Sequence, residues 1–183
     1  REAIKVMTDL VAEYGYYSSG ESFSIADKNE VWIMEMVGKG VGNKGALWVA
    51  IRIPDDCIAA HANQSRIHQI PFDDKENCMY APDVVSYARE KGYFKGKDKD
   101  FSFANAYCPY DFSGLRACEA RVWSFFRLYD KGMSKYEAFV RGDATKEPMP
   151  LYIKPDRKLS VQDVQQAMRN HYEGTSMDMT KDI

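Results

Sequence analysis

Residues 30–56 read EVWIMEMVGKGVGNKGALWVAIRIPDD, and this stretch decides the fold class. Its centre, GKGVGNKG at 38–45, contains a G-x-G-x-x-G pattern, which in dinucleotide-binding proteins joins a strand to the N-terminus of a helix. Here β-forming residues also follow the glycines, because ALWVAIRI at 46–53 has the composition of a second strand. The stretch therefore predicts a hairpin whose glycines supply positive φ angles, and it disfavours a nucleotide site.

The predicted sheet extends to both sides of this stretch. Turn-forming residues at 27–29 interrupt the β-rich segment 21–38, and Pro54 with two aspartates interrupts the segment 46–63. Each segment therefore reads as a β-hairpin, and the glycine loop joins the two. We predict four consecutive antiparallel strands.

Helical patterns flank the predicted strands. One apolar stripe at helical spacing consists of Ile4, Met7, Leu10, Val11 and Tyr14. It predicts an amphipathic helix over residues 1–14. Further helices are predicted from residue 81, over about 115–129, and from a Ser160 cap to near Gly174, whereas 101–112 reads as an aromatic-rich loop. The predicted fold class is α+β, with a single domain over 1–183.

The composition excludes several classes of function. A net charge of -2 gives no general attraction to nucleic acid, and no run of eighteen apolar residues is present to span a membrane. The cysteines are Cys57, Cys78, Cys108 and Cys118, none of which forms a C-x-x-C pair. A zinc or redox motif is therefore not predicted. Thiols are favoured, with disulfides left open.

Two charges lie inside apolar strands, where an unpaired charge is costly. They are Glu35 and Arg52, which the two hairpins could place opposite each other. They form an ordinary cross-strand ion pair, or they are two solvent-facing positions of the alternating pattern, or they bind substrate. The two structural alternatives are favoured, because structural charges are more common than functional ones.

Polar side chains gather where the second hairpin ends, in AAHANQSRI. Asn63 is the most useful of them chemically, because its amide can donate to a developing oxyanion during acyl transfer. A turn-forming role is equally consistent with the sequence. His61 is interpreted as structural, since no serine or cysteine nucleophile motif accompanies it.

Arg121 lies in CEARVWSFF and borders the apolar stripe of its predicted helix. Its guanidinium could anchor a carboxylate. The alternative, which the spacing alone favours, is an arginine whose stem covers the edge of the core.

Taken together, these motifs resemble one family. EVWIMEMVGKGVGNKGALWVAIRIPDDCIAAHANQSRI is similar to a segment of the cysteine-type dipeptidases, members of the N-terminal nucleophile hydrolase superfamily, that reads W-x-x-E-x-V-G, then W-V-A-x-R-x-P-D, then A-N-x-x-R-I. The closing RNHYEGTSMDMTKD is similar to the family's R-x-H-Y-E-G-T-x-x-D block. The resemblance spans most of residues 1–183.

The resemblance implies an αββα sandwich and a mechanism without metal or organic cofactor. An N-terminal cysteine attacks the peptide carbonyl, its own α-amine acts as base, and water hydrolyses the acyl-enzyme. Here the first residue is Arg1 and all four cysteines are internal. We therefore expect this chain to be an interior fragment of such a dipeptidase, inactive alone.

The resemblance also assigns candidate residues. Asn63 corresponds to the asparagine that related amidases place beside the nucleophile, and Arg121 to a downstream arginine, with Arg116 as its competitor. Glu35 and Arg52 lie in family blocks and are kept as substrate-binding candidates.

Two other functions stay open. One is an amide acylase of the same superfamily, and the other is a non-catalytic structural or interaction domain. A dipeptide is the expected partner, together with a second copy of the chain or the missing upstream portion. No compartment follows from the sequence, although the cytoplasm is favoured.

Overall fold

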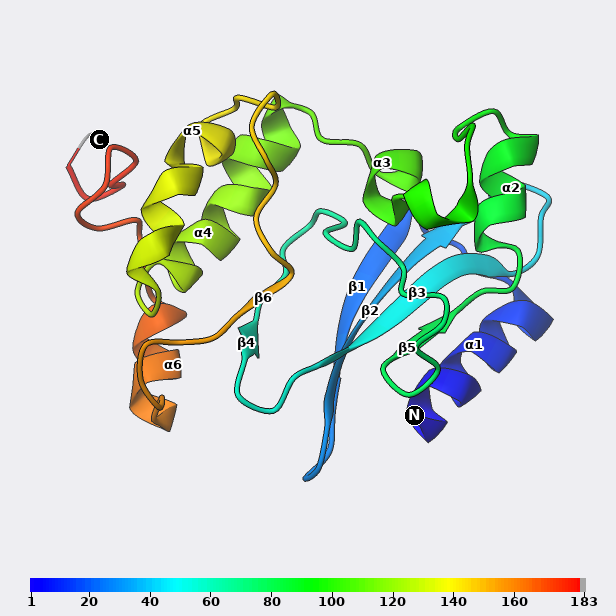
Figure 1. The fold of residues 1–183 in the computed structure, drawn as a ribbon, viewed down its shortest axis with the longest axis horizontal. Coiled ribbons are helices and arrows are strands. Elements are labelled where there is room, and N and C mark those ends of the chain that lie inside the picture. Colours follow the sequence, from blue (N-terminus) through cyan, green and yellow to red (C-terminus); the bar gives the residue numbers. More distant parts are fainter. Residues whose placement is uncertain (182–183) are drawn as a thin grey trace. The chain divides into compact units, whose positions relative to one another are not determined.

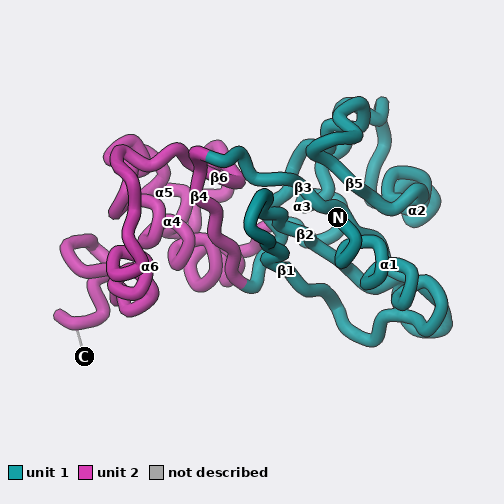
Figure 2. Tube along the Cα trace, turned by 90° about the horizontal axis from the view of Figure 1, so that it is seen from below, with its two compact units in different colours: residues 1–55, 63–109 teal, residues 56–62, 110–183 magenta. Residues whose placement is uncertain are grey.

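The computed structural model describes residues 1–181. The chain divides into two compact units, each discontinuous in sequence: residues 1–55 with 63–109, and residues 56–62 with 110–183 (Figure 2). Helices and antiparallel strands are both present, which confirms the α+β class. The single domain over 1–183 stays a prediction.

The first unit contains a four-stranded antiparallel sheet of order β1-β2-β3-β5. Its strands are β1 (Gly20–Ala26), β2 (Val31–Gly38), β3 (Ala46–Ile53) and β5 (Cys78–Tyr80). The glycine-rich segment joins β2 to β3 as predicted, with Gly38 opposite Ala46. Positive φ angles at Gly40, Gly42 and Gly45 explain why glycine is used there.

Helix α1 (Glu2–Tyr14) covers one face of this sheet and confirms the predicted first helix. Ile4 is fully buried and packs with Trp32, Met34 and Met36 of β2. Burying one such aliphatic side chain contributes about 1.5–3 kcal/mol. Gly15 ends the helix with a φ of 92°, and its N–H donates to the carbonyl of Val11.

On the opposite face of the sheet, Glu35 of β2 bonds to residues 65–67. The chain continues through β5 to α2 (Val84–Glu90), a 3₁₀ turn (Asp98–Asp100) and α3 (Phe103–Tyr107) (Figure 1). The helix expected from residue 81 is α2. The prediction of a loop over 101–112 was wrong at α3, whose N-cap is Ser102; the side chain of Ser102 accepts from the N–H of Asn105. A helix of five residues is too short to show helical periodicity.

The fourth predicted strand was also wrong. Residues 58–59 form β4 (Ile58–Ala59), which pairs with β6 (Tyr152–Ile153) in the second unit. The fourth position of the sheet is occupied by β5, opposite Val49 to Ile51 of β3. After Pro54 the chain turns away from the sheet. β4 therefore follows β3 in sequence but is not hydrogen-bonded to it.

The second unit is mainly helical. Its elements are a π-helical turn (Gly114–Glu119), α4 (Ala120–Phe126), a 3₁₀ turn (Lys131–Tyr136), α5 (Glu137–Val140), the β4–β6 pair and α6 (Val161–Ala167). The expected helix over about 115–129 is the π turn with α4. The Ser160–Asp163 capping box is present, but α6 ends at Ala167, short of the predicted Gly174.

A buried apolar cluster forms the core of the second unit. Its fully buried members include Leu115, Phe126 and Phe139, and Trp123 donates its indole N–H to the carbonyl of Met133 at 2.8 Å. Among the helices of residues 1–181, none is both long and apolar enough to cross a membrane.

Candidate active site

Asn63 is exposed at the start of a segment that is otherwise buried in the first unit. The four residues that follow, Gln64 to Ile67, are each 8% exposed or less. A fixed backbone lowers the ordering cost when a polar side chain on it binds a ligand, because only the side-chain rotamer then has to be fixed. The question is therefore what immobilises residues 64–68.

Glu35 holds this segment from the sheet side. Its carboxylate accepts from the hydroxyl of Ser65, from the N–H of Arg66 at 2.6 Å and from the N–H of Ile67 at 3.2 Å. The side chain is 2% exposed and β2 fixes its backbone. Glu35 is thus a positioning residue in this structure, and direct contact with substrate stays a prediction that the geometry does not favour.

The segment around α3 holds the same residues from the other side. The N–H groups of Ala104 and Phe103 donate to the carbonyls of Ile67 and His68, both at 2.9 Å. Gln64 donates its side-chain amide to the carbonyl of Cys108 at 2.6 Å. Residues 64–68 are therefore bonded on two sides, and Gln64 is part of the support.

The acid–base state of Glu35 gives a testable pH dependence. Burial raises the pKa of Glu35 above its usual range, although the hydrogen bonds from Ser65, Arg66 and Ile67 oppose the rise. Because the folded state then binds the proton more tightly than the unfolded state, stability falls as pH increases from about 4.3 up to the raised pKa.

Glu35→Gln removes this titration and keeps an acceptor for Arg66. We expect the free energy of unfolding of the variant, minus that of the wild type, to increase with pH over that window. Urea denaturation at stepped pH measures the difference, with Glu13→Gln, at an exposed position, as the control for loss of one charge. A difference that stays constant or shrinks with pH would contradict the expectation.

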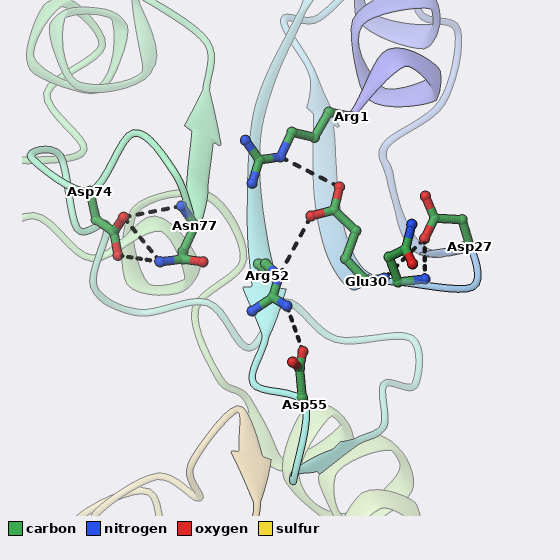
Figure 3. A network of polar contacts seen from close by, with 8 residues as sticks. Arg1, Asp27, Glu30, Arg52, Asp55, Asp74 and Asn77 are labelled. Atoms are coloured by element: carbon green, nitrogen blue, oxygen red, sulfur yellow. Dashed lines mark hydrogen bonds and ion pairs between the residues drawn. The ribbon is translucent and has the colours of Figure 1, made fainter.

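Arg52 lies away from Glu35. Its guanidinium contacts Glu30 at 3.5 Å and also binds Asp55, and Arg1 contacts the other oxygen of Glu30 at 3.4 Å (Figure 3). Arg52 and Glu30 are both partly buried, whereas Asp55 is exposed. The structure favours an ion-pair network, and substrate binding by Arg52 stays a prediction.

The strand register separates the two charges that we considered as a possible pair. Arg52 is opposite Trp32, whereas Glu35 is opposite Val49. Because Trp32 and Glu35 are an odd number of residues apart, their side chains point to opposite faces of the sheet. A pairing of Glu35 with Arg52 is therefore wrong.

Arg121 belongs to the second unit and is exposed near the start of α4. Its Nε donates to the carbonyl of Ala117 at 2.7 Å, and its Nη2 lies 3.6 Å from the sulfur of Cys118. Arg121 thus lies along the π-helical turn that also carries Arg116. Its catalytic role stays a prediction.

The structure holds all four cysteines as thiols. Burial raises the pKa of Cys78 to about 12, and burial with the Asp56 carboxylate raises that of Cys57. Raised pKa values disfavour the nucleophilic thiolate. Within residues 1–181, no group of three or more His, Cys, Asp or Glu side chains is arranged to hold a metal ion.

Sequence reasoning missed the support around Asn63. The signal was visible in part, since Glu35 is a carboxylate at a buried position of an apolar strand. Its partners are a hydroxyl and two backbone N–H groups from 30 to 32 residues away, and no local pattern indicates such a contact.

With this geometry established, comparison with known sequences is informative. The whole chain, residues 1–183, matches Peptidase family C69. The chain belongs to this family. This membership agrees with the sequence resemblance described above.

Named relatives carry the same description. The chain is similar to a "Probable dipeptidase" of Salmonella dublin (29% identity, 97% of this chain and 38% of the relative). It is also similar to a "Probable dipeptidase" of Latilactobacillus sakei (30%, 97% and 34%) and to "Dipeptidase A" of Lactobacillus helveticus (26%, 97% and 34%). The chain therefore spans about a third of the length of these curated relatives.

Proposed function

We propose that the protein containing this chain is a dipeptidase that cleaves the peptide bond through a cysteine acyl-enzyme. The observation that carries the proposal is the C69 match over the whole chain, with relatives named as dipeptidases. The site geometry supports it, because Asn63 is exposed on a segment that Glu35 and α3 hold in place.

In the proposed mechanism, the thiolate of an N-terminal cysteine attacks the peptide carbonyl, and the carbonyl oxygen becomes an oxyanion. The side-chain amide of Asn63 donates to that oxyanion. The amine product leaves with a proton, and water then hydrolyses the thioester. The fixed backbone of residues 64–68 keeps the donor oriented through both steps.

The four cysteines of this chain are internal and so lack the free α-amine that serves as base in this mechanism. The chain is therefore proposed to supply supporting groups and to be inactive alone. No cofactor is invoked.

For the fold, we propose the αββα sandwich of N-terminal nucleophile hydrolases. The support is an antiparallel four-stranded sheet with α1 packed on one face. This sheet would be one of the two central layers.

We also propose that the chain associates with further polypeptide, either a second copy or another part of the same protein. Apolar side chains on α1 are exposed at Val6, Leu10 and Tyr14, four residues apart and so on one side of the helix. Sedimentation of the full-length protein tests self-association. Covalent surface labelling of Val6, Leu10 and Tyr14 tests whether another part of the protein covers them. A monomer in which these side chains are labelled as fast as exposed residues would contradict the proposal.

The function is tested by giving the folded full-length protein two kinds of substrate: a panel of dipeptides, and acyl amides such as an N-acyl amino acid. We expect release of both amino acids from dipeptides and slower cleavage of the acyl amides. Preference for the acyl amides would support the amide acylase. A folded protein that cleaves neither would support a non-catalytic domain.

A further inference from the structure

A groove in the first unit lies beside the C-terminal end of helix α1. Its volume is about 590 Å³, within the range of about 300–1,000 Å³ that is usual for small-molecule sites. One wall is the segment 14–19, between α1 and β1, and the other is the glycine turn 40–44, between β2 and β3. Asn63 does not line this groove, so the groove is a candidate for a binding site of its own.

Three tyrosines give the groove its aromatic character. They are Tyr14, Tyr16 and Tyr17, and Val41 adds an aliphatic side chain from the glycine turn. Tyr17 and Val41 are fully exposed, so nearly all of their apolar surface is available for burial by a ligand. Tyrosine rings pack well against another aromatic ring and lose little conformational entropy in doing so. The groove therefore favours a ligand that contains an aromatic ring.

Lys44 is the only lining residue whose side chain is ionised at neutral pH. Its Nζ donates to the backbone carbonyl of Glu13 at 3.1 Å, which offsets the negative end of the α1 dipole. A lysine ammonium has three donors, so two are left for other acceptors. Lys44 forms no ion pair with any residue of 1–181. By charge complementarity, the groove therefore favours a ligand that carries a negative charge.

Hydrogen bonds hold both walls of the groove in place. In the glycine turn, the side-chain amide of Asn43 donates to the carbonyl of Lys39 at 3.1 Å. In the other wall, the carbonyl of Ser19 accepts from the N–H of Gly38 at 3.2 Å. A Cβ at Gly38 would lie 2.6 Å from the carbonyl oxygen of Ser18, so glycine allows this wall to lie directly against β2. A groove whose walls are already held needs less ordering when a ligand binds.

We propose that this groove binds an aromatic carboxylate, with the ring packed against Tyr16 and Tyr17 and the carboxylate bound by Lys44. Phenylacetate and the aromatic amino acids belong to this chemical class. Both parts of the ligand contribute, because the ring buries the tyrosine surface and the carboxylate supplies the counter-ion of Lys44. The proposed site does not depend on the dipeptidase function.

The experiment titrates the folded full-length protein with three probes at low ionic strength, followed by ligand-observed NMR. The probes are phenylacetate, phenylethanol, which keeps the ring without the charge, and acetate, which keeps the charge without the ring. We expect phenylacetate to bind about 2- to 5-fold more tightly than phenylethanol, the contribution of one exposed ion pair. Acetate should bind more weakly than phenylacetate by about 2- to 10-fold or more, because it lacks the ring.

Substitutions of Lys44 test the charge. Lys44→Gln keeps a donor for the Glu13 carbonyl but removes the charge, so the dissociation constant for phenylacetate should rise about 2- to 5-fold. That for phenylethanol should not change. Lys44→Glu reverses the charge, so phenylethanol should become the tighter of the two ligands. Lys28→Gln, at an exposed lysine of the same unit outside the groove, is the matched control.

Tyr17→Ala tests the aromatic contact. Because the side chain is fully exposed, its loss should leave the fold intact, which thermal unfolding checks. The dissociation constants for phenylacetate and phenylethanol should both rise about 2- to 10-fold, and that for acetate should not change.

Equal binding of phenylacetate and phenylethanol to the wild type would overturn the proposal. Phenylacetate binding that neither Lys44→Gln nor Tyr17→Ala weakens would overturn it too, because the ligand then binds elsewhere. Absence of binding, the result expected if another part of the protein covers the groove, would also exclude the site. Since the readout is binding, a full-length protein that cleaves no dipeptide would contradict the proposed function and leave this test unaffected.

Discussion

Glu35→Ala is expected to lower the free energy of unfolding by about 3 kcal/mol or more, because it leaves three buried donors without an acceptor. These donors are the Ser65 hydroxyl and the N–H groups of Arg66 and Ile67, all of which now donate to the Glu35 carboxylate. Each unsatisfied buried group costs about 1–3 kcal/mol. Urea denaturation of the full-length protein gives the total effect. Hydrogen exchange at the Arg66 and Ile67 amides locates it, since both should exchange faster.

Glu35→Gln is the matched control. Its amide oxygen still accepts from Arg66, and its NH₂ group donates to the Ser65 hydroxyl, so we expect a loss under about 1.5 kcal/mol. If Glu35→Ala is no more destabilising than Glu35→Gln and the two amides stay protected, the carboxylate does not hold residues 65–67.

Asn63→Ala is expected to lower kcat for dipeptide hydrolysis in the full-length protein by about 10²- to 10³-fold, the usual result of removing one oxyanion donor. The side chain is exposed, so the free energy of unfolding should change by less than about 1 kcal/mol. Steady-state kinetics and thermal unfolding of the same preparations separate the two effects.

Asn63→Asp distinguishes donation from shape. The carboxylate has nearly the same size but only accepts hydrogen bonds, so it should be as defective as alanine if donation to the oxyanion is what matters. Gln69→Ala is the control for loss of an exposed amide side chain from the same segment. It leaves the backbone bridge between residue 69 and Ser102 intact, so activity should be unchanged. Full activity of Asn63→Asp would rule out an oxyanion donor at this position.

Local patterns predicted the parts of the fold whose contacts are local. Helix α1, the β2–β3 hairpin with its glycine loop, and the Ser160 cap all depend on residues close in sequence. The fourth strand of the sheet could not be predicted in this way. β5 has only three residues and is separated from β3 by a long connecting segment. Tertiary packing therefore determines its place in the sheet.

In the candidate site, too, the residues could be recognised from local sequence, whereas the contact between them could not. Asn63 and Glu35 were both recognisable, one as an amide at a strand end and the other as a charge within a buried strand. Their connection was not, because Glu35 contacts Arg66 through the backbone N–H, which every non-proline residue carries.

The excursion of residues 56–62 into the second unit has a consequence for synthesis on the ribosome. Asp56 binds Lys154, 98 residues later, and Ile58 pairs with Ile153. At translation rates of about 5–20 residues per second, the nascent chain carries β4 without its partner for about 5–20 seconds. During that interval the apolar Ile58 strand has no native neighbour to pair with. A chaperone that shields apolar segments of nascent chains would therefore have its largest effect between the emergence of these two strands, and slower translation of the intervening residues would lengthen the exposure.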